Sequence, residues 1–227
     1  MNFSKLFLAA VTLLPGGHAF SATPLKTEVE RPDLVATFKS EVAKRGTKPQ
    51  ITLWTLRRQS NRVEMRDLRH DTGEIWRRDQ HGNISFEQVF HRQRRIIDYT
   101  ASDLRSLDSD PSWQRVSEIA DAELFGGTLK RVGSTRALGR PAERFKGRSS
   151  EFDVEIIWLP GERLPYKVKR QSPGQRTELT LTRLAPLDDP DAGDPTSDYL
   201  RLDYADLGDG PSDLFFRQLA EHAEHKH

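Results

Sequence analysis

The 227-residue sequence contains no cysteine, only two methionines and no long uninterrupted apolar stretch. The absence of cysteine excludes disulfide bonds, thiolate metal ligands, a thiol nucleophile and the acylated cysteine of a lipoprotein. A helix that crosses a membrane needs about 20 apolar residues, so the sequence does not predict a membrane-spanning protein. With 35% hydrophobic and 30% charged residues, the composition is that of a globular chain.

The N-terminus has the parts of a secretory signal peptide. Lys5 provides a positive charge, residues 6–14 are apolar, and Gly17-His18-Ala19 has the small-x-small pattern of a cleavage site. We predict a signal peptide over residues 1–19; a short buried helix is the alternative. Secreted eukaryotic domains usually contain disulfides, so the missing cysteines favour a bacterial periplasm, with the mature protein soluble there.

Charge is divided between two parts of the chain, although the formal net charge is only +1. Residues 186–227 contain eleven acidic and three basic residues, whereas the rest of the mature chain contains 31 basic and 23 acidic residues. Because opposite charges attract, we predict that residues 187–227 form an acidic C-terminal segment that docks on the body. Alternatively, the basic body faces an anionic partner.

The mature chain begins with a predicted helix and continues mostly with strands. Leu34, Phe38 and Val42 follow Pro32 at four-residue steps, and Gly46 ends the pattern, which predicts an amphipathic helix. Short runs separated by turn residues then predict an antiparallel meander. Its strands are expected at 51–56, 62–68, 74–77, 84–90 and 95–99.

A second helix interrupts the strands. Ser109-Asp110-Pro111 begins it, Trp113, Val116, Ala120 and Leu124 form its apolar side, and Gly126-Gly127 ends it. Further strands are expected at 129–132, 142–146, 153–159, 166–170 and 178–184, with an extended segment at 199–207 and a short helix after Ser212. The pattern predicts an α+β fold in which a strongly curved antiparallel sheet, a half barrel or incomplete barrel, is covered by helices.

Several segments resemble the periplasmic outer-membrane lipoprotein carrier (LolA-like) superfamily. They are Gly73-Glu74-Ile75-Trp76, Gly139-Arg140-Pro141-Ala142-Glu143-Arg144-Phe145, Ile156-Ile157-Trp158-Leu159-Pro160 and Leu164-Pro165-Tyr166-Lys167-Val168. The order of elements is also similar, over residues 31 to 186, and we take 24–186 as the LolA-like domain. The resemblance implies an apolar concave face that, under helices, holds acyl chains. Proteins of this fold carry or sense lipids and lipoproteins.

Six aromatic residues on predicted strands are candidates to line such a cavity: Trp54, Trp76, Phe86, Phe90, Trp158 and Tyr166. Strand alternation shows only that a side chain points inward, so for each of them a residue of a packed core is the alternative.

Arginine is abundant between residues 57 and 95. Guanidinium groups bind carboxylates and phosphates, so Arg58, Arg62, Arg77 and Arg94 are candidates to hold an anionic headgroup, a partner protein or the acidic C-terminal segment. The alternative is a solvated outer face of the sheet.

Catalytic motifs are missing: the sequence has no Gly-x-Ser-x-Gly elbow, phosphate loop or His-Glu-x-x-His helix. We therefore predict no enzyme, no catalytic residue and no cofactor. His222, His225 and His227 have the spacing of metal ligands, but a solvated chain end explains them, and we predict no metal site. No nucleic-acid-binding motif is present.

These observations predict an exported periplasmic binding protein that carries or senses a lipid or lipoprotein acyl chain in an apolar cavity. The alternative is a periplasmic interaction or regulatory module with a packed core, no lipid ligand and another envelope protein as its partner. An enzyme on the same scaffold is a third reading, and it requires titratable groups clustered in the cavity.

Overall fold

The computed structural model describes residues 31–109, 111–119, 129–148, 150–188 and 194–209. The predicted signal peptide, the helix after Ser212 and the three C-terminal histidines lie outside the described residues.

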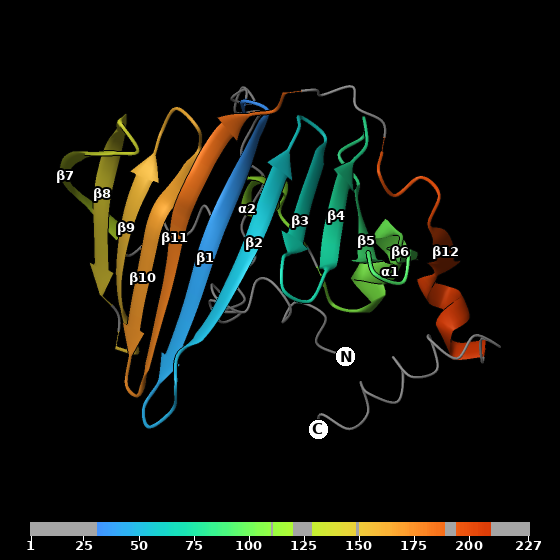
Figure 1. Cartoon of the computed structure of the whole chain (residues 1–227), viewed down its shortest axis with the longest axis horizontal. Coiled ribbons are helices and arrows are strands. Elements are labelled where there is room, and N and C mark those ends of the chain that lie inside the picture. Colours follow the sequence, from blue (N-terminus) through green and yellow to red (C-terminus); the bar gives the residue numbers. More distant parts are fainter. Residues whose placement is uncertain (1–30, 110, 120–128, 149, 189–193, 210–227) are drawn as a thin grey trace.

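The described strands form one open, twelve-stranded sheet in the order β12-β6-β5-β4-β3-β2-β1-β11-β10-β9-β8-β7 (Figure 1). Their bounds are β1 Leu34–Lys44, β2 Gln50–Arg58, β3 Arg62–Asp67, β4 Thr72–Arg78, β5 Ile84–Phe90, β6 Arg95–Tyr99, β7 Leu129–Ala137, β8 Arg140–Arg148, β9 Asp153–Leu159, β10 Leu164–Ser172, β11 Gln175–Pro186 and β12 Leu200–Asp203. Neighbouring strands are antiparallel except β12, which runs parallel to β6. The predicted curved, mostly antiparallel sheet is confirmed.

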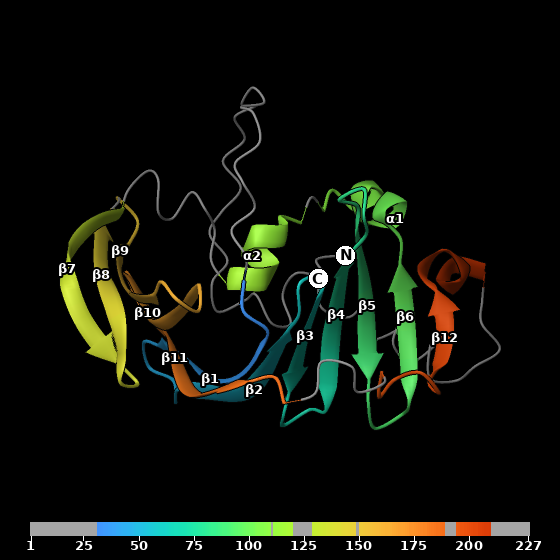
Figure 2. The same ribbon diagram turned by 90° about the horizontal axis from the view of Figure 1, so that it is seen from above.

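Helices cover little of this sheet, contrary to the predicted helical cover. In the described part of the chain, α1 (Ala101–Ser106) and α2 (Trp113–Glu118) have six residues each. Both lie on the concave side of the sheet (Figure 2). The sheet is curved but does not close into a barrel, and its concave face is the first place in which we look for a site.

The helix predicted from Pro32 to Gly46 is wrong, because residues 34–44 form the central strand β1. Leu34, Ala36 and Phe38 are buried at every second position. A four-residue spacing is also two strand periods, so the apolar positions fit both structures. Residues 34–44 form a strand because β2 and β11 pair with them and satisfy their backbone hydrogen-bonding groups on both sides.

The two helices are positioned by their caps. The side chain of Thr100 accepts from the amide of Asp103, whose carboxylate accepts from the amide of Thr100 in return, and this capping box begins α1. For α2 the cap is Ser112, three residues after the predicted one. Ile119, with a φ of 58°, ends α2 in the left-handed region; residues 120–128 of the predicted helix lie outside the described residues.

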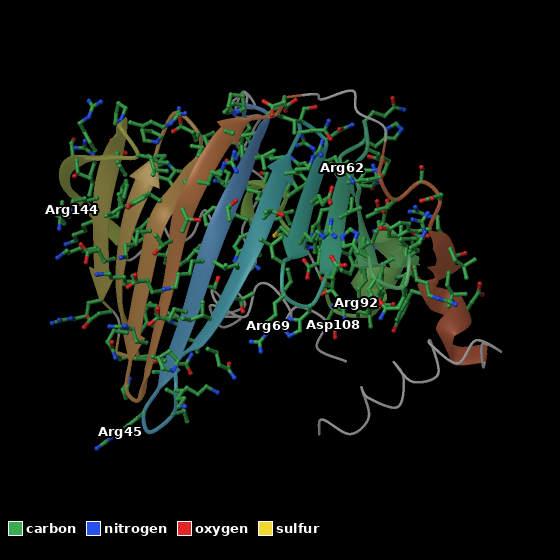
Figure 3. The ribbon with its side chains drawn as sticks, in the orientation of Figure 1. Arg45, Arg62, Arg69, Arg92, Asp108 and Arg144 are labelled. Carbon is green, nitrogen blue, oxygen red and sulfur yellow. The ribbon has the colours of Figure 1, made fainter. Side chains whose placement is uncertain are left out.

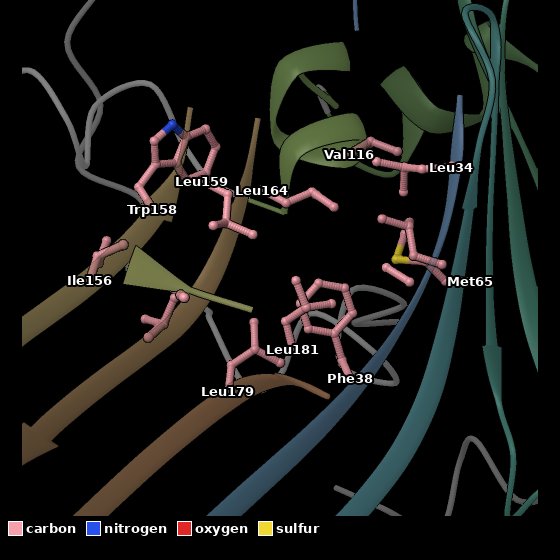
Figure 4. Packing of buried hydrophobic residues seen from close by; sticks show 14 of the residues in the cluster. Leu34, Phe38, Met65, Val116, Ile156, Trp158, Leu159, Leu164, Leu179 and Leu181 are labelled. Atoms are coloured by element: carbon pink, nitrogen blue, oxygen red, sulfur yellow. The ribbon is translucent and has the colours of Figure 1, made fainter. Parts of the chain in front are cut away.

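The main apolar cluster lies on the concave face of β1–β3 and β7–β11, beneath α2 (Figure 4). Phe38, Met65, Ile156 and Leu181 contribute to it from the strands, and Val116 from α2. A second cluster joins Phe86, Phe90, Ile97 and Tyr99 to Leu104 of α1.

A third cluster, formed by Ile75, Val89 and Ile96, is packed on the convex face against Tyr199. Residues 194–199 lead into β12, and the amide of Leu200 donates to the carbonyl of Arg94 at 3.0 Å. After β12, residues Tyr204–Asp209 form a 3₁₀ helix. Part of the acidic C-terminal segment is therefore the last strand of the sheet.

Candidate functional site

The predicted aromatic residues lie in or against the concave-face clusters. Trp54 stacks on Phe38 with ring centres 4.6 Å apart and donates to the hydroxyl of Ser40 at 2.9 Å. Trp158 belongs to the main cluster and Phe90 to the second. These three aromatic side chains are buried.

Trp76 connects the two clusters. It packs against both of them, and its ring centre lies 4.5 Å from that of Phe86, which in turn lies 5.1 Å from that of Tyr99. Trp76 and Tyr166 are only partly buried, unlike the other four predicted aromatic residues. They are therefore the members of the set with side-chain surface left for a ligand.

Glu74 is a feature of this face that the sequence analysis missed. It is 7% exposed, two residues from Trp76 on the same side of β4, and it accepts from the indole of Trp76 at 3.2 Å. Its partners on the neighbouring strands are Met65 and Gln88. Burial raises the pKa of Glu74 to about 7, and the hydrogen bond from Trp76 only partly opposes it. The sequence feature that indicates this position is the alternation in Gly73-Glu74-Ile75-Trp76, which places Glu74 on the same face of the strand as Trp76.

Arg58, one of the predicted anion-binding candidates, contacts backbone carbonyls of the chain itself. Its guanidinium is fully buried and donates to the carbonyls of Ser117 at 2.9 Å, Glu162 at 2.6 Å and Pro32 at 3.1 Å. Burial, together with repulsion from Arg31, lowers its pKa to about 10 although Glu118 opposes this. Arg58 thus holds backbone segments together.

The same residues anchor the end of α2. The buried carboxylate of Glu118 lies 2.9 Å from Arg31 and 2.7 Å from Arg163. Together with the bond from Arg58 to Ser117, these contacts form what we call the α2 clamp, made by Arg31, Arg58, Glu118 and Arg163. The clamp is polar, whereas Trp113 and Val116 hold the rest of α2 to the main cluster by apolar contact.

The other three predicted arginines contact acidic residues of the chain itself. Arg77 lies 2.7 Å from Glu87 and 2.6 Å from Asp194, and Arg62 lies 2.9 Å from Glu64 and 3.6 Å from Asp194. Burial tends to raise the pKa of Asp194, but hydrogen bonds from Thr196 and Arg77 outweigh it and hold that pKa well below its usual range.

Arg94 forms an ion pair with Asp198, and its guanidinium lies 5.2 Å from the ring centre of Tyr199. Of the three roles predicted for the arginine candidates, contact with the acidic C-terminal segment is the one visible in the structure.

A pocket of about 760 Å³ opens at the rim of the sheet, where β3 begins and β4 ends. We call it the rim pocket; its lining residues are Gln59, Asn61, Arg62, Arg77, Arg78, Asp79, Asn83, Ile84, Ser85, Thr100, Ala101, Ser102 and Arg105. None of the six predicted aromatic residues lines it. In Figure 3, Arg62 lies at this end of the strands and Arg69 at the opposite end.

No group of His, Asp or Glu side chains in the described ranges is arranged to bind a metal ion. Among the described helices, none has the length and apolar content to cross a membrane.

Comparison with known proteins gives structural matches alone. No protein-family model and no curated protein matches the sequence. Solved structures similar to this chain include a LolA superfamily protein. This one, from Nitrosomonas europaea, has a TM-score of 0.38 and 8% identity over 72% of this chain and 90% of its own.

Two further matches have similar scores. An uncharacterised conserved protein from Thermus thermophilus has a TM-score of 0.41 and 12% identity over 74% of this chain and 90% of its own. MucB has a TM-score of 0.39 and 18% identity over 74% of this chain and 60% of its own. The superfamily that the sequence resembles is thus among the matches, but likeness at this level says nothing about a ligand.

Proposed function

We propose that this chain is an exported periplasmic binding protein that carries or senses the acyl chain of a lipid or lipoprotein on its concave face. Export through the predicted signal peptide is part of the proposal. The supporting observation is the concave face itself: a broad apolar surface whose central part is covered, among the described residues, by the six-residue helix α2.

The attachment of α2 suits a small lid. Trp113 and Val116 touch the main cluster by apolar contact, which an acyl chain can replace with contact of the same kind. The α2 clamp is polar and lies at the C-terminal end of the helix, so displacement of the apolar side leaves that end attached. Binding of this kind is noncovalent and needs no cofactor.

The expected affinity follows from the apolar surface of the ligand. Burial of about ten methylene groups at ~0.8 kcal/mol each contributes about 8 kcal/mol, which corresponds to a dissociation constant of about 1 µM before the cost of association is subtracted and therefore sets the upper bound of the affinity.

The four tryptophans of the chain provide the measurement, because Trp54, Trp76, Trp113 and Trp158 all lie in or against the main cluster. A dansyl-labelled fatty acid bound there accepts energy from them. We expect saturable energy transfer from tryptophan to dansyl, displaced by an unlabelled fatty acid.

Trp76→Lys tests the location of the site. Trp76 is partly exposed and lies beside Glu74, whose carboxylate gives the new ammonium a partner, so we expect the variant to fold. Its affinity for the probe should fall at least about tenfold. Leu53→Lys is the matched control: it lies on the convex side of β2 and is 47% exposed, and we expect unchanged binding.

Two results contradict the proposal. One is the lack of saturable binding by the wild-type protein; the other is an equal loss of affinity in Leu53→Lys and Trp76→Lys. With either result, the chain is better described as a periplasmic interaction module with a packed core and a protein partner.

A further inference from the structure

The rim pocket has a chemistry different from that of the concave face. Its lining contains four arginines and one aspartate, together with the amides of Gln59, Asn61 and Asn83 and the hydroxyls of Ser85, Thr100 and Ser102. Its volume of about 760 Å³ lies in the range of small-molecule sites. A surface of this kind favours a negatively charged, hydrogen-bonding ligand.

The acidic lining residue does not neutralise the arginines. Asp79 accepts from the amides of His81 and Asn83 and from the side-chain amide of Asn83, each at 2.8 Å, so it is engaged in its own turn. The guanidinium of Arg78 lies 5.1 Å from the ring centre of Trp113, the first residue of α2. The four arginines outnumber the single carboxylate of Asp79, so the lining residues themselves carry a net positive charge beside α1.

Asp194 shows how a carboxylate interacts with this lining. Its two oxygens lie 2.6 Å from Arg77 and 3.6 Å from Arg62. The Nε atom of Arg62 is buried, and no acceptor reaches it from the described residues. Arg62 and Arg77 thus share this carboxylate in addition to their own ion pairs with Glu64 and Glu87, and Arg62 keeps one N–H donor without an acceptor among the described residues.

We propose that the rim pocket binds a phosphate or carboxylate group carried by a hydroxyl-rich molecule, and that Asp194 competes with this anion for Arg62 and Arg77. Arg78 and Arg105 supply charge that Asp194 does not contact, and the lining amides and hydroxyls contact the remainder of the ligand. The site does not require an acyl chain, so it stands independently of the proposed function.

Titration calorimetry with glycerol 3-phosphate at low salt tests the site in the full chain. Arg105→Gln removes an exposed pocket charge and should weaken binding at least about fivefold. Arg69→Gln is the matched control, since it removes the same charge from an exposed arginine at the opposite end of the strands. It should leave the affinity within about twofold of wild type.

Asp194→Asn tests the proposed competition, and for this variant we expect tighter binding of glycerol 3-phosphate, not weaker binding. Loss of this carboxylate leaves Arg62 paired with Glu64 and Arg77 with Glu87 but removes the acceptor that they share, so the affinity for glycerol 3-phosphate should rise at least about threefold. Asp153→Asn changes the net charge equally but removes a partner of Arg148 on β8 and β9, and should have no effect.

The source of the anion is distinguished by vesicle flotation. If the wild-type protein floats with phosphatidylglycerol vesicles but not with phosphatidylcholine vesicles, and Arg105→Gln abolishes flotation, the ligand is a lipid headgroup. If glycerol 3-phosphate binds without flotation, the ligand is a soluble ester. The proposal is overturned if neither probe binds, if Arg69→Gln weakens binding as much as Arg105→Gln, or if Asp194→Asn fails to strengthen it.

Discussion

At the scale of single residues, the charged groups of the concave side were the hardest to predict. Arginine-rich segments are visible in the sequence, but whether a guanidinium faces solvent or backbone depends on segments far away along the chain. Arg58 is buried because carbonyls of residues 32, 117 and 162 converge on it. Only the folded chain brings these three carbonyls together, so no local pattern distinguishes Arg58 from its exposed neighbours.

Glu74 provides a prediction about pH. Its pKa is raised from 4.5 to about 7 in the folded state, so the folded protein holds this proton more tightly than the unfolded chain. Its contribution to stability is complete below about pH 4.5 and is lost as the pH rises through about 7, a change on the order of 3 kcal/mol. Glu74→Gln cannot ionise and should therefore gain stability relative to wild type as the pH rises.

Urea unfolding at about pH 5 and about pH 8 measures this difference. Asp71→Asn is the control: a hydrogen bond from Arg66 lowers the pKa of Asp71, so that carboxylate stays ionised over this range. The control should change stability by the same amount at both pH values. A stability difference between Glu74→Gln and wild type that is constant with pH would show that Glu74 is not a buried, titrating group.

At the scale of elements, most strands were predictable and the errors have definite causes. The runs at 84–90, 95–99 and 153–159 match β5, β6 and β9, because one apolar face and clear turn residues define them. β1 was misread because its spacing fits two periodicities. α1 was missed although the Thr100-x-x-Asp103 pattern signals a helix start, since only one turn and a half follows it.

The C-terminal segment gives a prediction at this scale. Truncation after Pro186 removes Tyr199 from the third cluster, Asp194 from Arg62 and Arg77, and the edge strand β12 from its partner β6. We expect the truncated chain to have a lower midpoint of thermal unfolding than the full chain. That all of residues 187–227 dock on the body stays a prediction, which this experiment tests. A truncated chain with an unchanged midpoint contradicts it.

Two point variants separate the forces involved. Asp194→Asn should cost on the order of 1 kcal/mol at low salt and less at high salt, because its ion pairs are partly exposed and screened. Tyr199→Ala should cost a similar amount at both salt concentrations, because it loses apolar contact with Ile75, Val89 and Ile96.

At the scale of the whole molecule, the sequence predicts successive antiparallel strands but not the pairing between strands that are far apart in the chain. The strand β1 lies between β2, its neighbour in sequence, and β11, which follows about 140 residues later. This long-range pairing places the two halves of the sheet side by side and makes the concave face continuous. The rim pocket, in contrast, is built locally, because all of its lining residues lie between Gln59 and Arg105, in β3, β4, β5, α1 and the segments next to them.

The position of β1 predicts how stability is distributed over the sheet. β1 is paired on both sides, and Phe38 is fully buried at its centre, whereas β7 is an edge strand with one partner. Local opening requires less free energy where fewer contacts are broken. Amide hydrogen exchange of the native protein should therefore be slowest in β1, β2 and β11 and fastest in the two edge strands, β7 and β12.

Two variants test this predicted variation of amide exchange rates over the sheet. Phe38→Ala removes a buried ring stacked on Trp54, with an expected cost on the order of 3–5 kcal/mol, and should speed exchange throughout the sheet. Val132→Ala alters a side chain on β7 that is 52% exposed, and should change exchange in β7 and β8 only. If β7 exchanged as slowly as β1, or if Phe38→Ala affected β1 alone, the sheet would not be one cooperative unit centred on β1, and the continuous concave face would not be held by that strand.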